Sequence, residues 1–500
     1  MIMTTPAVKR MPDTTMPDRA IGASFRDPSG FVFEHDGRIY RQVNRSYRDD
    51  YDHLMSSGLY KELTSKGLLV AHSEVDPPDG VDSNSNYYKT LLPDRVPFIS
   101  YPYEWCFSQL KDAALLTLRL QKLALKHDMV LKDASAYNIQ FGQSGPVMID
   151  TLSFERYEEG RPWVGYRQFC QHFLAPLALM ARRDVRLLDL MRVQLDGVPL
   201  DLAVSLLPAR TWLNWGLFMH LRMHARYQRS YEAAGQQGAN AEATDRKNAG
   251  AHGPGVSRKA LGNLIEDLRA VVRKLDWTPK GTEWAEYYSG DSYSEDSLAH
   301  KQSLIAQYVE RLNPACVWDL GANTGVYSRI AATAGARVIA FDVDPACVER
   351  NYRMVRKNKE ENLLPLRLDL VNPSPSIGWA HDERSSLAER ANADMVLALA
   401  LVHHIAISNN VPLSKIAFYF ARLAPHLVIE FVPKSDAKVK TLLATRVDVF
   451  PGYTREGFEA AFSEWFETLE SSPIRGSDRI LYLLKRKKGS PSADTGRSTS

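Results

Sequence analysis

One stretch of the sequence constrains the fold of this chain more than any other. Residues 317–344 read VWDLGANTGVYSRIAATAGARVIAFDVD. The stretch is an apolar strand, a glycine-rich turn that opens a helix, and a second apolar strand that ends in a carboxylate, which is the order a nucleotide-type crevice needs. Gly321 and Gly325 let the backbone approach a ligand without a Cβ in the way, and Asp342 can accept both hydroxyl protons of a ribose.

Strands and helices alternate on the C-terminal side of this turn. The alternation predicts an α/β fold with a doubly wound, Rossmann-like parallel sheet. Farther along, YTREGFEAAFSEWFE predicts an amphipathic helix with Phe458, Phe462 and Phe466 in the core. The predicted strands are Cys316–Leu320, Arg337–Asp342, Leu364–Asp369, Met395–Leu401, Leu427–Val432 and Ile480–Lys485, and predicted helices begin at Val326 and Pro345.

The turn reads DxGxNxG over residues 319–325, where a dinucleotide fold normally has GxGxxG. Together with the strands that follow, it resembles class I S-adenosylmethionine-dependent methyltransferases, over residues 285–485. The alternative is an ordinary Rossmann-like turn that binds another nucleotide or none. The resemblance implies that S-adenosylmethionine is the cofactor, with its methionine end lined by Asp319, Gly321, Asn323 and Gly325, its ribose held by Asp342 and its adenine amino group contacted by Asp369.

Three residues are candidates for catalysis on the acceptor side. The strand in ADMVLALALVHHI ends at His403 and His404, and the carboxyl end of such a strand is where ligands bind in open α/β sheets. A neutral histidine there can take a proton from an acceptor hydroxyl or amine as the methyl group transfers. Either histidine can instead cap the next helix. Glu430, inside LVIEFVP, is a carboxylate on a predicted strand and therefore needs a partner. Upstream, Tyr287, Tyr288 and Tyr293 either fold over the cofactor or pack as core aromatics.

A second motif lies in the N-terminal half. HDMVLKDASAYNIQFGQSGPVMIDTLSFE resembles the catalytic loop of protein-kinase-like and aminoglycoside-phosphotransferase-like enzymes, which implies a two-lobed α+β domain. On that resemblance Asp133 is the catalytic aspartate, Asn138 a metal ligand and Asp150 the DFG-type aspartate, so that Mg and ATP are possible cofactors of the first domain. The sequence departs from the pattern: DFG has become Asp-Thr-Leu, no glycine-rich phosphate loop is visible, and Arg41 stands near the position of the phosphate-binding lysine.

Composition sets the remaining bounds. The 62 basic and 59 acidic residues leave a net charge of +3, too balanced to predict binding to nucleic acid. Four scattered cysteines predict neither a disulfide framework nor a metal site, and they suit a reducing compartment, the cytoplasm by default. No run of residues is long and apolar enough to predict a membrane span. The predicted division is a mobile tail (1–23), a kinase-like domain (24–232), a flexible linker (233–258), a methyltransferase domain (259–487) and a second mobile tail (488–500).

The leading functional hypothesis is methyl transfer from S-adenosylmethionine to a small-molecule or glycan acceptor. Two alternatives stay open: a bifunctional kinase and methyltransferase acting on one acceptor, and a pseudokinase scaffold that presents substrate to the methyltransferase domain. Some bacterial proteins of similar two-part layout have been linked to host-specific nodulation or to envelope glycans. The sequence identifies neither the acceptor nor the oligomeric state.

Overall fold

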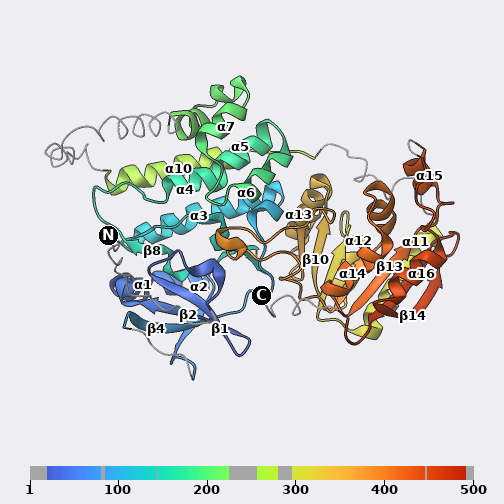
Figure 1. Ribbon diagram of the computed structural model, residues 1–500. Helices are drawn as coiled ribbons and strands as arrows, with labels where there is room; N and C mark the ends of the chain where they lie inside the picture. Colours follow the sequence, from blue (N-terminus) through green and yellow to red (C-terminus); the bar gives the residue numbers. More distant parts are fainter. Residues whose placement is uncertain are drawn as a thin grey trace, which may run out of the picture.

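The computed structural model describes residues 20–79, 85–142, 145–223, 256–279, 295–444 and 447–490. Most of the predicted tails and of the predicted linker, and Tyr287, Tyr288 and Tyr293, lie outside these residues. The chain forms a first domain, blue to green in Figure 1, and a second domain built on one large sheet, yellow to red. None of the helices among the described residues is long and apolar enough to cross a membrane.

The first domain opens with an antiparallel four-stranded sheet of order β1-β2-β4-β3. Asp36 and Gly37, with φ of 48° and 71°, form the tight turn between β1 and β2, as the Asp-Gly pair predicts. Ile21 donates from its N–H to the Val32 carbonyl, so the predicted N-terminal tail ends before this residue. The elements are η1 (Gly22–Ser24), β1 (Gly30–His35), β2 (Arg38–Asn44), η2 (Arg45–Tyr47), α1 (Arg48–Ser56), α2 (Leu59–Ser65), β3 (His72–Val75) and β4 (Tyr87–Pro93).

The remainder of the first domain is largely helical and is built around one long buried helix, α3. The apolar run at Arg95–Ser100 predicts a strand from its sequence, and that prediction is wrong, because these residues form an extended connection without strand pairing. The elements are η3 (Pro102–Glu104), α3 (Phe107–Lys126), β5 (Met129–Leu131), η4 (Ala136–Asn138), β6 (Ile139–Gly142), β7 (Gly145–Met148), η5 (Thr151–Ser153), β8 (Phe154–Arg156), α4 (Tyr166–Phe169), η6 (Cys170–Leu174), α5 (Ala175–Arg182), η7 (Val185–Asp189), α6 (Leu190–Val193), α7 (Leu200–Leu206), η8 (Ala209–Leu213), α8 (Trp215–Leu217), η9 (Phe218–Met223) and α10 (Arg258–Lys274).

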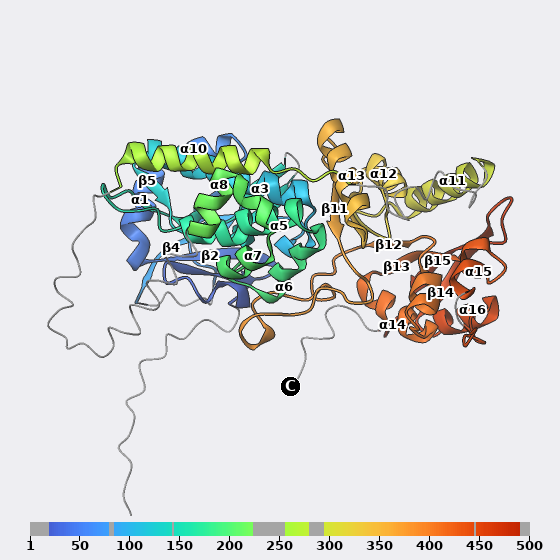
Figure 2. The ribbon, with the colours of Figure 1, turned by 90° about the horizontal axis from the view of Figure 1, so that it is seen from above.

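Helix α10 belongs to the body of the first domain, although the predicted boundary assigns it to the second. It lies along α3, as Figure 2 shows, and buries Leu261, Ile265 and Leu268. The Val256 N–H donates to the Gly160 carbonyl and Ser257 caps the helix, so the predicted linker ends before Val256. The boundary between the two domains therefore lies after α10, C-terminal to the predicted one.

The second domain is a seven-stranded sheet of order β11-β10-β9-β12-β13-β15-β14. The first five strands are parallel, and β15 pairs antiparallel with both β13 and β14. This arrangement confirms the predicted α/β sheet, with helices on both faces. The elements are α11 (Glu295–Leu312), β9 (Cys316–Leu320), α12 (Val326–Thr333), β10 (Arg337–Asp342), α13 (Pro345–Asn358), β11 (Leu363–Arg367), η12 (Trp379–His381), β12 (Met395–Ala398), η13 (His404–Ser408), α14 (Leu413–Leu423), β13 (His426–Phe431), α15 (Ala437–Leu443), α16 (Arg455–Ser463), β14 (Phe466–Pro473) and β15 (Ile480–Arg486).

Helix α16 buries Phe458 and Phe462 as predicted. The third predicted core aromatic of that helix, Phe466, instead begins β14, an edge strand that the sequence pattern did not predict. The stripe is core, but it is shared between a helix and a strand.

Candidate functional site

The glycine turn joins the end of β9 to the start of α12. Gly321 and Gly325 have φ of 77° and 81°, a region that favours glycine, and Asn323 between them has φ of 51°. The Gly321 and Ala322 N–H groups both donate to the Phe341 carbonyl of β10, which fixes the turn against the neighbouring strand. A Cβ on Gly321 would lie 3.3 Å from Cδ1 of Leu401, which is tighter than most Cβ contacts, so a side chain at this position would press on the loop after β12.

Asp342, the last residue of β10, faces the turn. Its Oδ2 accepts the Asn323 N–H at 2.7 Å, and its Oδ1 accepts the Asp344 N–H at 2.8 Å. Each oxygen keeps a further acceptor position for a ligand hydroxyl. Burial raises the pKa of this carboxyl to about 6, although the backbone hydrogen bonds lower it. The glycine turn and this carboxylate therefore lie in contact, and the role of Asp342 toward a ribose stays a prediction.

Asp319, the residue before the last in β9, has a different surrounding. It is buried and its Oδ2 accepts the Ser328 hydroxyl of α12 at 2.6 Å. Burial raises the pKa of Asp319 to about 6, against the effect of the Ser328 hydrogen bond. The Asp319 side chain thus links β9 to α12. This contact fixes both ends of the glycine turn between them.

Asp369 follows β11 and is exposed. Its Oδ1 accepts the Val371 N–H at 2.9 Å, so the carboxylate supports a local turn at the end of the strand. Among the described residues no hydrogen bond joins it to Asp342, and its role toward an adenine stays a prediction. Because β11, β10 and β9 are parallel neighbours, all three candidate acids nevertheless end at the same edge of the sheet.

The two histidines follow β12 at that same edge. Their rings are in contact, with centroids 4.0 Å apart. His403 is fully buried, and neither of its ring nitrogens has a hydrogen-bond partner among the described residues. Burial, with the positive charges of nearby side chains, holds the pKa of His403 well below its usual range and lowers that of His404 to about 4. Both rings are therefore neutral at pH 7, and an unpartnered buried nitrogen suits a ligand hydroxyl or amine.

Glu430 lies inside a buried ion-pair network. Its Oε2 accepts from the Lys301 Nζ at 2.6 Å and from the Ala400 N–H at 2.8 Å, and its Oε1 lies 3.4 Å from the guanidinium of Arg479. Ala400 has φ of 50°, a left-handed conformation that costs a residue with a Cβ free energy. Glu430 therefore holds the loop that leads to His403, and its role among the reacting groups stays a prediction.

The sequence indicates that Glu430 needs a partner, but it does not identify Lys301 as that partner. A signal was available in the spacing: Lys301 stands four residues before Ile305 and three before Leu304 in α11, on the stripe that the helix buries. A lysine on such a stripe needs a buried counter-charge.

The residues of the second domain fit S-adenosylmethionine on these observations. The positive-φ glycine turn and the acceptor positions of Asp342 provide a cradle and a hydroxyl anchor. The unpartnered nitrogens of His403 provide a hydrogen-bond acceptor at the same sheet edge. The chemistry available is positioning of a ribose-bearing cofactor beside a neutral imidazole.

The predicted phosphotransfer residues also come together in the first domain. Asn138 donates from Nδ2 to the Ser153 hydroxyl at 3.2 Å, and that hydroxyl donates to Oδ2 of Asp150. Burial and the nearby Asp150 raise the pKa of Asp133. Arg41, predicted to stand near the lysine position, places its guanidinium 2.5 Å from Oδ1 of Asp150.

Both oxygens of Asp150 are thus already engaged. Oδ1 also accepts the Leu152 N–H at 3.0 Å, while Oδ2 accepts from Ser153. A metal ion on this carboxylate would have to displace the Arg41 guanidinium, which carries the same sign of charge. These residues do not fit a metal-bound nucleotide as they stand.

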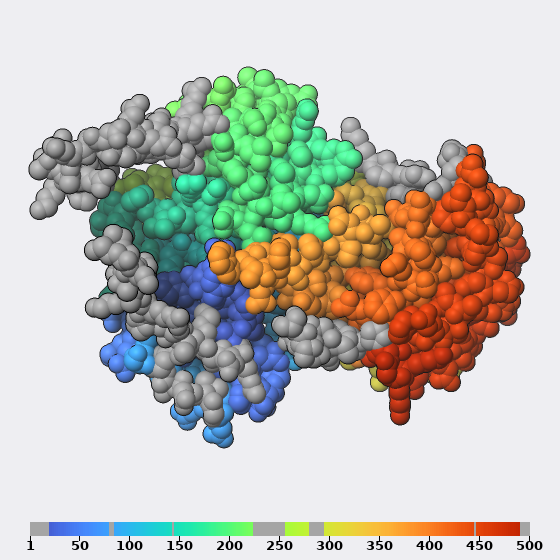
Figure 3. Space-filling model, viewed as in Figure 1, coloured from blue at the N-terminus to red at the C-terminus, as the bar shows by residue number. Residues whose placement is uncertain are grey.

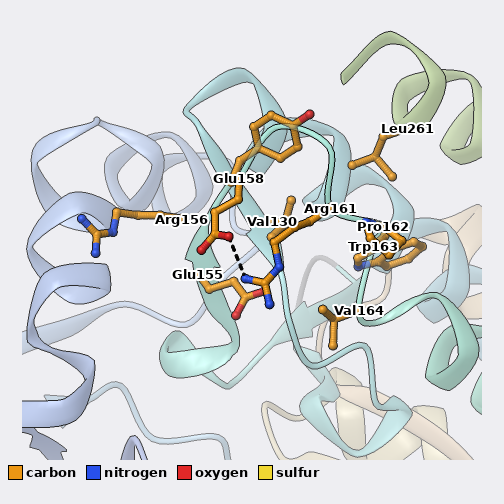
Figure 4. A pocket seen from close by; sticks show the side chains of 10 residues that line it. Val130, Glu155, Arg156, Glu158, Arg161, Pro162, Trp163, Val164 and Leu261 are labelled. Atoms are coloured by element: carbon orange, nitrogen blue, oxygen red, sulfur yellow. Dashed lines mark ion pairs between the residues drawn. The ribbon is translucent and has the colours of Figure 1, made fainter. Parts of the chain in front are cut away.

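A small cavity of about 10 Å³ lies elsewhere in the first domain, between β8, the following loop and α10 (Figure 4). Arg161 and Glu158 form an ion pair of 3.0 Å at its rim, and Leu261 and Trp163 contribute apolar surface. It contains none of the predicted site residues and has room for a single water molecule at most.

Comparison with known proteins gives one close likeness. No known family model matches the sequence. The chain is 36% identical over 476 residues to the nodulation protein NoeA of Rhizobium meliloti (strain 1021), which covers 94% of this chain and 97% of that protein.

Likenesses to solved structures are distant. Magnesium protoporphyrin IX methyltransferase (ChlM) from Synechocystis PCC 6803, with bound SAH, is 16% identical with a TM-score of 0.30, over 41% of this chain and 94% of that chain. The bifunctional kinase-methyltransferase WbdD is 14% identical with a TM-score of 0.27, over 40% of this chain and 42% of that chain. The likeness to NoeA, by contrast, runs along nearly the whole of both chains.

Proposed function

This chain belongs to the same family as the nodulation protein NoeA, and we propose that within this family it transfers a methyl group from S-adenosylmethionine to a small-molecule or glycan acceptor. The observation that carries the proposal is the pairing of the glycine turn with Asp342. A carboxylate at the end of β10 binds the Asn323 N–H at 2.7 Å, within the turn that the positive-φ residues Gly321 and Gly325 form.

The residues divide the work in the following way. S-adenosylmethionine supplies a methyl group on a sulfonium when it is bound. Asp342 accepts the ribose hydroxyls, and the turn at residues 321–325 fixes the methionine end. His403 accepts a hydrogen bond from the acceptor hydroxyl or amine and orients it, since its ring is neutral and its nitrogens have no partner among the described residues. The rate then comes mainly from holding donor and acceptor in line.

Equilibrium binding to the full-length chain tests the proposal. Isothermal titration calorimetry with S-adenosylmethionine should detect binding, and Asp342→Ala should weaken it roughly a hundredfold, because hydrogen bonds to a charged acceptor are lost. Glu361→Ala removes an exposed carboxylate close to the start of β11 and is the matched control. A chain that does not bind this cofactor, or one whose binding Asp342→Ala leaves unchanged, contradicts the proposal.

The acceptor needs a separate experiment. The relative's name refers to nodulation, and we place the product of this chain in the same process. Mass spectrometry of glycans and small metabolites should find a species heavier by one CH2 in cells that contain the chain. That species should be absent from cells that contain Asp342→Ala.

For the first domain, the Arg41–Asp150 ion pair favours the scaffold over phosphotransfer. The pair holds the carboxylate that a phosphotransferase needs for its metal, and both partners are largely buried. The domain thus supports the methyltransferase without consuming ATP. The bifunctional alternative requires this pair to open.

Nucleotide binding separates the two alternatives. Mg and ATP together should leave the melting temperature of the full-length chain unchanged, and an Asp133→Ala, Asp150→Ala double variant should keep its affinity for S-adenosylmethionine. Magnesium-dependent ATP turnover that disappears in Asp133→Ala would establish the bifunctional enzyme instead.

A further inference from the structure

One crossover of the large sheet lacks the helix that the others have. Residues 368–394, which join β11 to β12, contain only the short 3-10 turn η12, whereas α12, α13 and α14 occupy the three neighbouring crossovers. A parallel strand in an α/β sheet needs cover on both faces. The face left open by this crossover must therefore be covered by something else.

The first domain provides that cover through Phe98. The ring of Phe98 packs edge-on against Trp318 of β9, with centroids 5.7 Å apart, and against Phe341 of β10 at 6.2 Å. Trp318 and Phe341 are themselves in edge contact at 5.2 Å. All three rings are buried and belong to one core that spans both domains.

These contacts lie directly behind the two carboxylates of the site. Trp318 immediately precedes Asp319, and Phe341 immediately precedes Asp342. Because side chains alternate along a strand, the aromatic rings face the first domain while the acids face the other side. On that side Asp319 meets Ser328 of α12, and Asp342 meets the Asn323 N–H.

Hydrogen bonds on both sides of Phe98 fix the segment that carries it. The Arg390 guanidinium donates to the Ile99 carbonyl at 2.7 Å and pairs with Glu104, whose side chain is 1% exposed. Asn392 donates to the Pro97 carbonyl at 3.0 Å. Both donors belong to the end of the irregular crossover. The crossover therefore holds in place the segment that covers the sheet where a helix would otherwise lie.

A second set of contacts joins α3 to the sheet domain. Glu349 of α13 is fully buried and accepts the Ser108 N–H at 3.0 Å, at the start of α3. Gln109 donates from its side chain to the Pro365 carbonyl of β11 at 3.0 Å. The position of the first domain against β9, β10 and β11 is therefore fixed at several points.

The middle of the crossover lies on the first domain in return. The Arg384 guanidinium stacks over the Tyr137 ring at 4.4 Å, and Glu383 pairs with Arg26. In Figure 3 the orange part of the chain extends across the boundary between the blue and green parts of the first domain. Each domain therefore covers part of the other: the segment with Phe98 covers the sheet, and residues 368–394 cover part of the first domain.

We propose that the first domain replaces the missing crossover helix of the methyltransferase sheet, and that Phe98 is a positioning residue that sets Asp319 and Asp342 for cofactor binding. This inference rests on the proposed function. Phe98 acts through the strand backbones and touches no cofactor atom. Loss of its ring lets Trp318 and Phe341 shift, and the carboxylates on the other side of the same strands shift with them.

Calorimetric titration of full-length variants with S-adenosylmethionine tests this role. Phe98→Ala should weaken binding on the order of tenfold, a coupling typical of a residue that acts through packing. Two controls are matched to it. Phe169→Ala removes an equally buried ring that packs on Trp163 and Phe173 within the first domain, and Ile99→Ala alters the partly exposed neighbour. Both controls should keep the affinity of the unaltered chain.

Each result decides the question. Weakening confined to Phe98→Ala supports the inference, whereas unchanged binding in that variant, or equal weakening in Phe169→Ala, overturns it. If Phe98→Ala does not fold, Phe98→Leu takes its place, because leucine retains most of the apolar volume. The same weakening of S-adenosylmethionine binding is then expected of Phe98→Leu. If the unaltered chain itself fails to bind, the proposed function fails and the inference falls with it; binding by the unaltered chain and by Phe98→Ala alike overturns the inference alone.

Discussion

At the scale of single residues, the site combines two carboxyls whose charged forms are disfavoured by burial. For Asp342, the folded-state pKa of about 6 lies above the unfolded value, so the free energy of unfolding that this group contributes is present at low pH and is lost as pH rises through 6. Cofactor binding has the opposite dependence, because the charged form accepts the ribose hydroxyls.

We therefore expect the affinity for S-adenosylmethionine to fall about tenfold per pH unit below the pKa of Asp342, since the proton must leave first. Calorimetric titrations from about pH 5 to about pH 8 measure this profile, and Asp342→Asn should remove it. A constant affinity over that range would mean that the carboxyl is already charged throughout.

The buried charges around Glu430 give a stability prediction. Glu430→Gln leaves the Lys301 ammonium, which is 2% exposed, without its carboxylate. The free energy of unfolding should fall by about 3 kcal/mol, as expected when one partner of a buried ion pair is removed. Urea denaturation measures the loss, with Glu464→Gln, at an exposed position, as the control. Equal stabilities of the two variants would show that Lys301 finds another counter-charge.

The need for a partner of Glu430 followed from the sequence, but the identity of the partner did not. Lys301 and Glu430 are 129 residues apart, and no local pattern encodes such a contact. The same holds for Phe98, whose neighbours Trp318 and Phe341 lie in another domain. By contrast, the pairing of the glycine turn with Asp342 is set by a short strand–turn–helix–strand order, and it was predictable for that reason.

At the scale of elements, the sequence located β9 and β10 at the residues where the structure has them, because both are continuous apolar runs bounded by turn residues. β14 was missed, since FETLESSP carries charged and polar residues along an edge strand paired on one side only. The lack of a helix between β11 and β12 was not predicted either, because the segment that covers the sheet there comes from the first domain.

The glycine turn gives a matched pair of variants at this scale. An added Cβ on Gly325 would lie 2.6 Å from the Asn351 amide and 2.7 Å from the Arg329 guanidinium, whereas one on Gly335 would meet nothing within 4 Å. Both glycines have positive φ, so the backbone strain of an alanine is shared. Gly325→Ala should cost about 1–2 kcal/mol more than Gly335→Ala, because hydrogen bonds of Arg329 must break.

Chemical denaturation of both variants measures that difference, and calorimetry should find that only Gly325→Ala weakens cofactor binding. Equal stability losses would indicate that Arg329 and Asn351 move aside freely.

At the scale of the whole molecule, the shared core predicts one cooperative unfolding transition in place of two. Arg390→Met leaves Glu104 buried without its guanidinium and should lower the stability of both domains together, by about 3 kcal/mol. Scanning calorimetry checks this, with Lys122→Met, which breaks an exposed pair with Glu266, as the control. Two separate transitions in the unaltered chain would contradict a shared core.

The irregular crossover at residues 368–394 has a practical consequence for anyone who wishes to divide this polypeptide. Separating the domains would remove the Phe98 ring from the strands that carry Asp319 and Asp342. It would also remove Arg384 from the Tyr137 ring of the first domain. Neither fragment would keep the structure that it has in the full-length chain. A chimera that exchanges one domain with that of a relative would have to take residues 97–109 and 368–394 from the same parent.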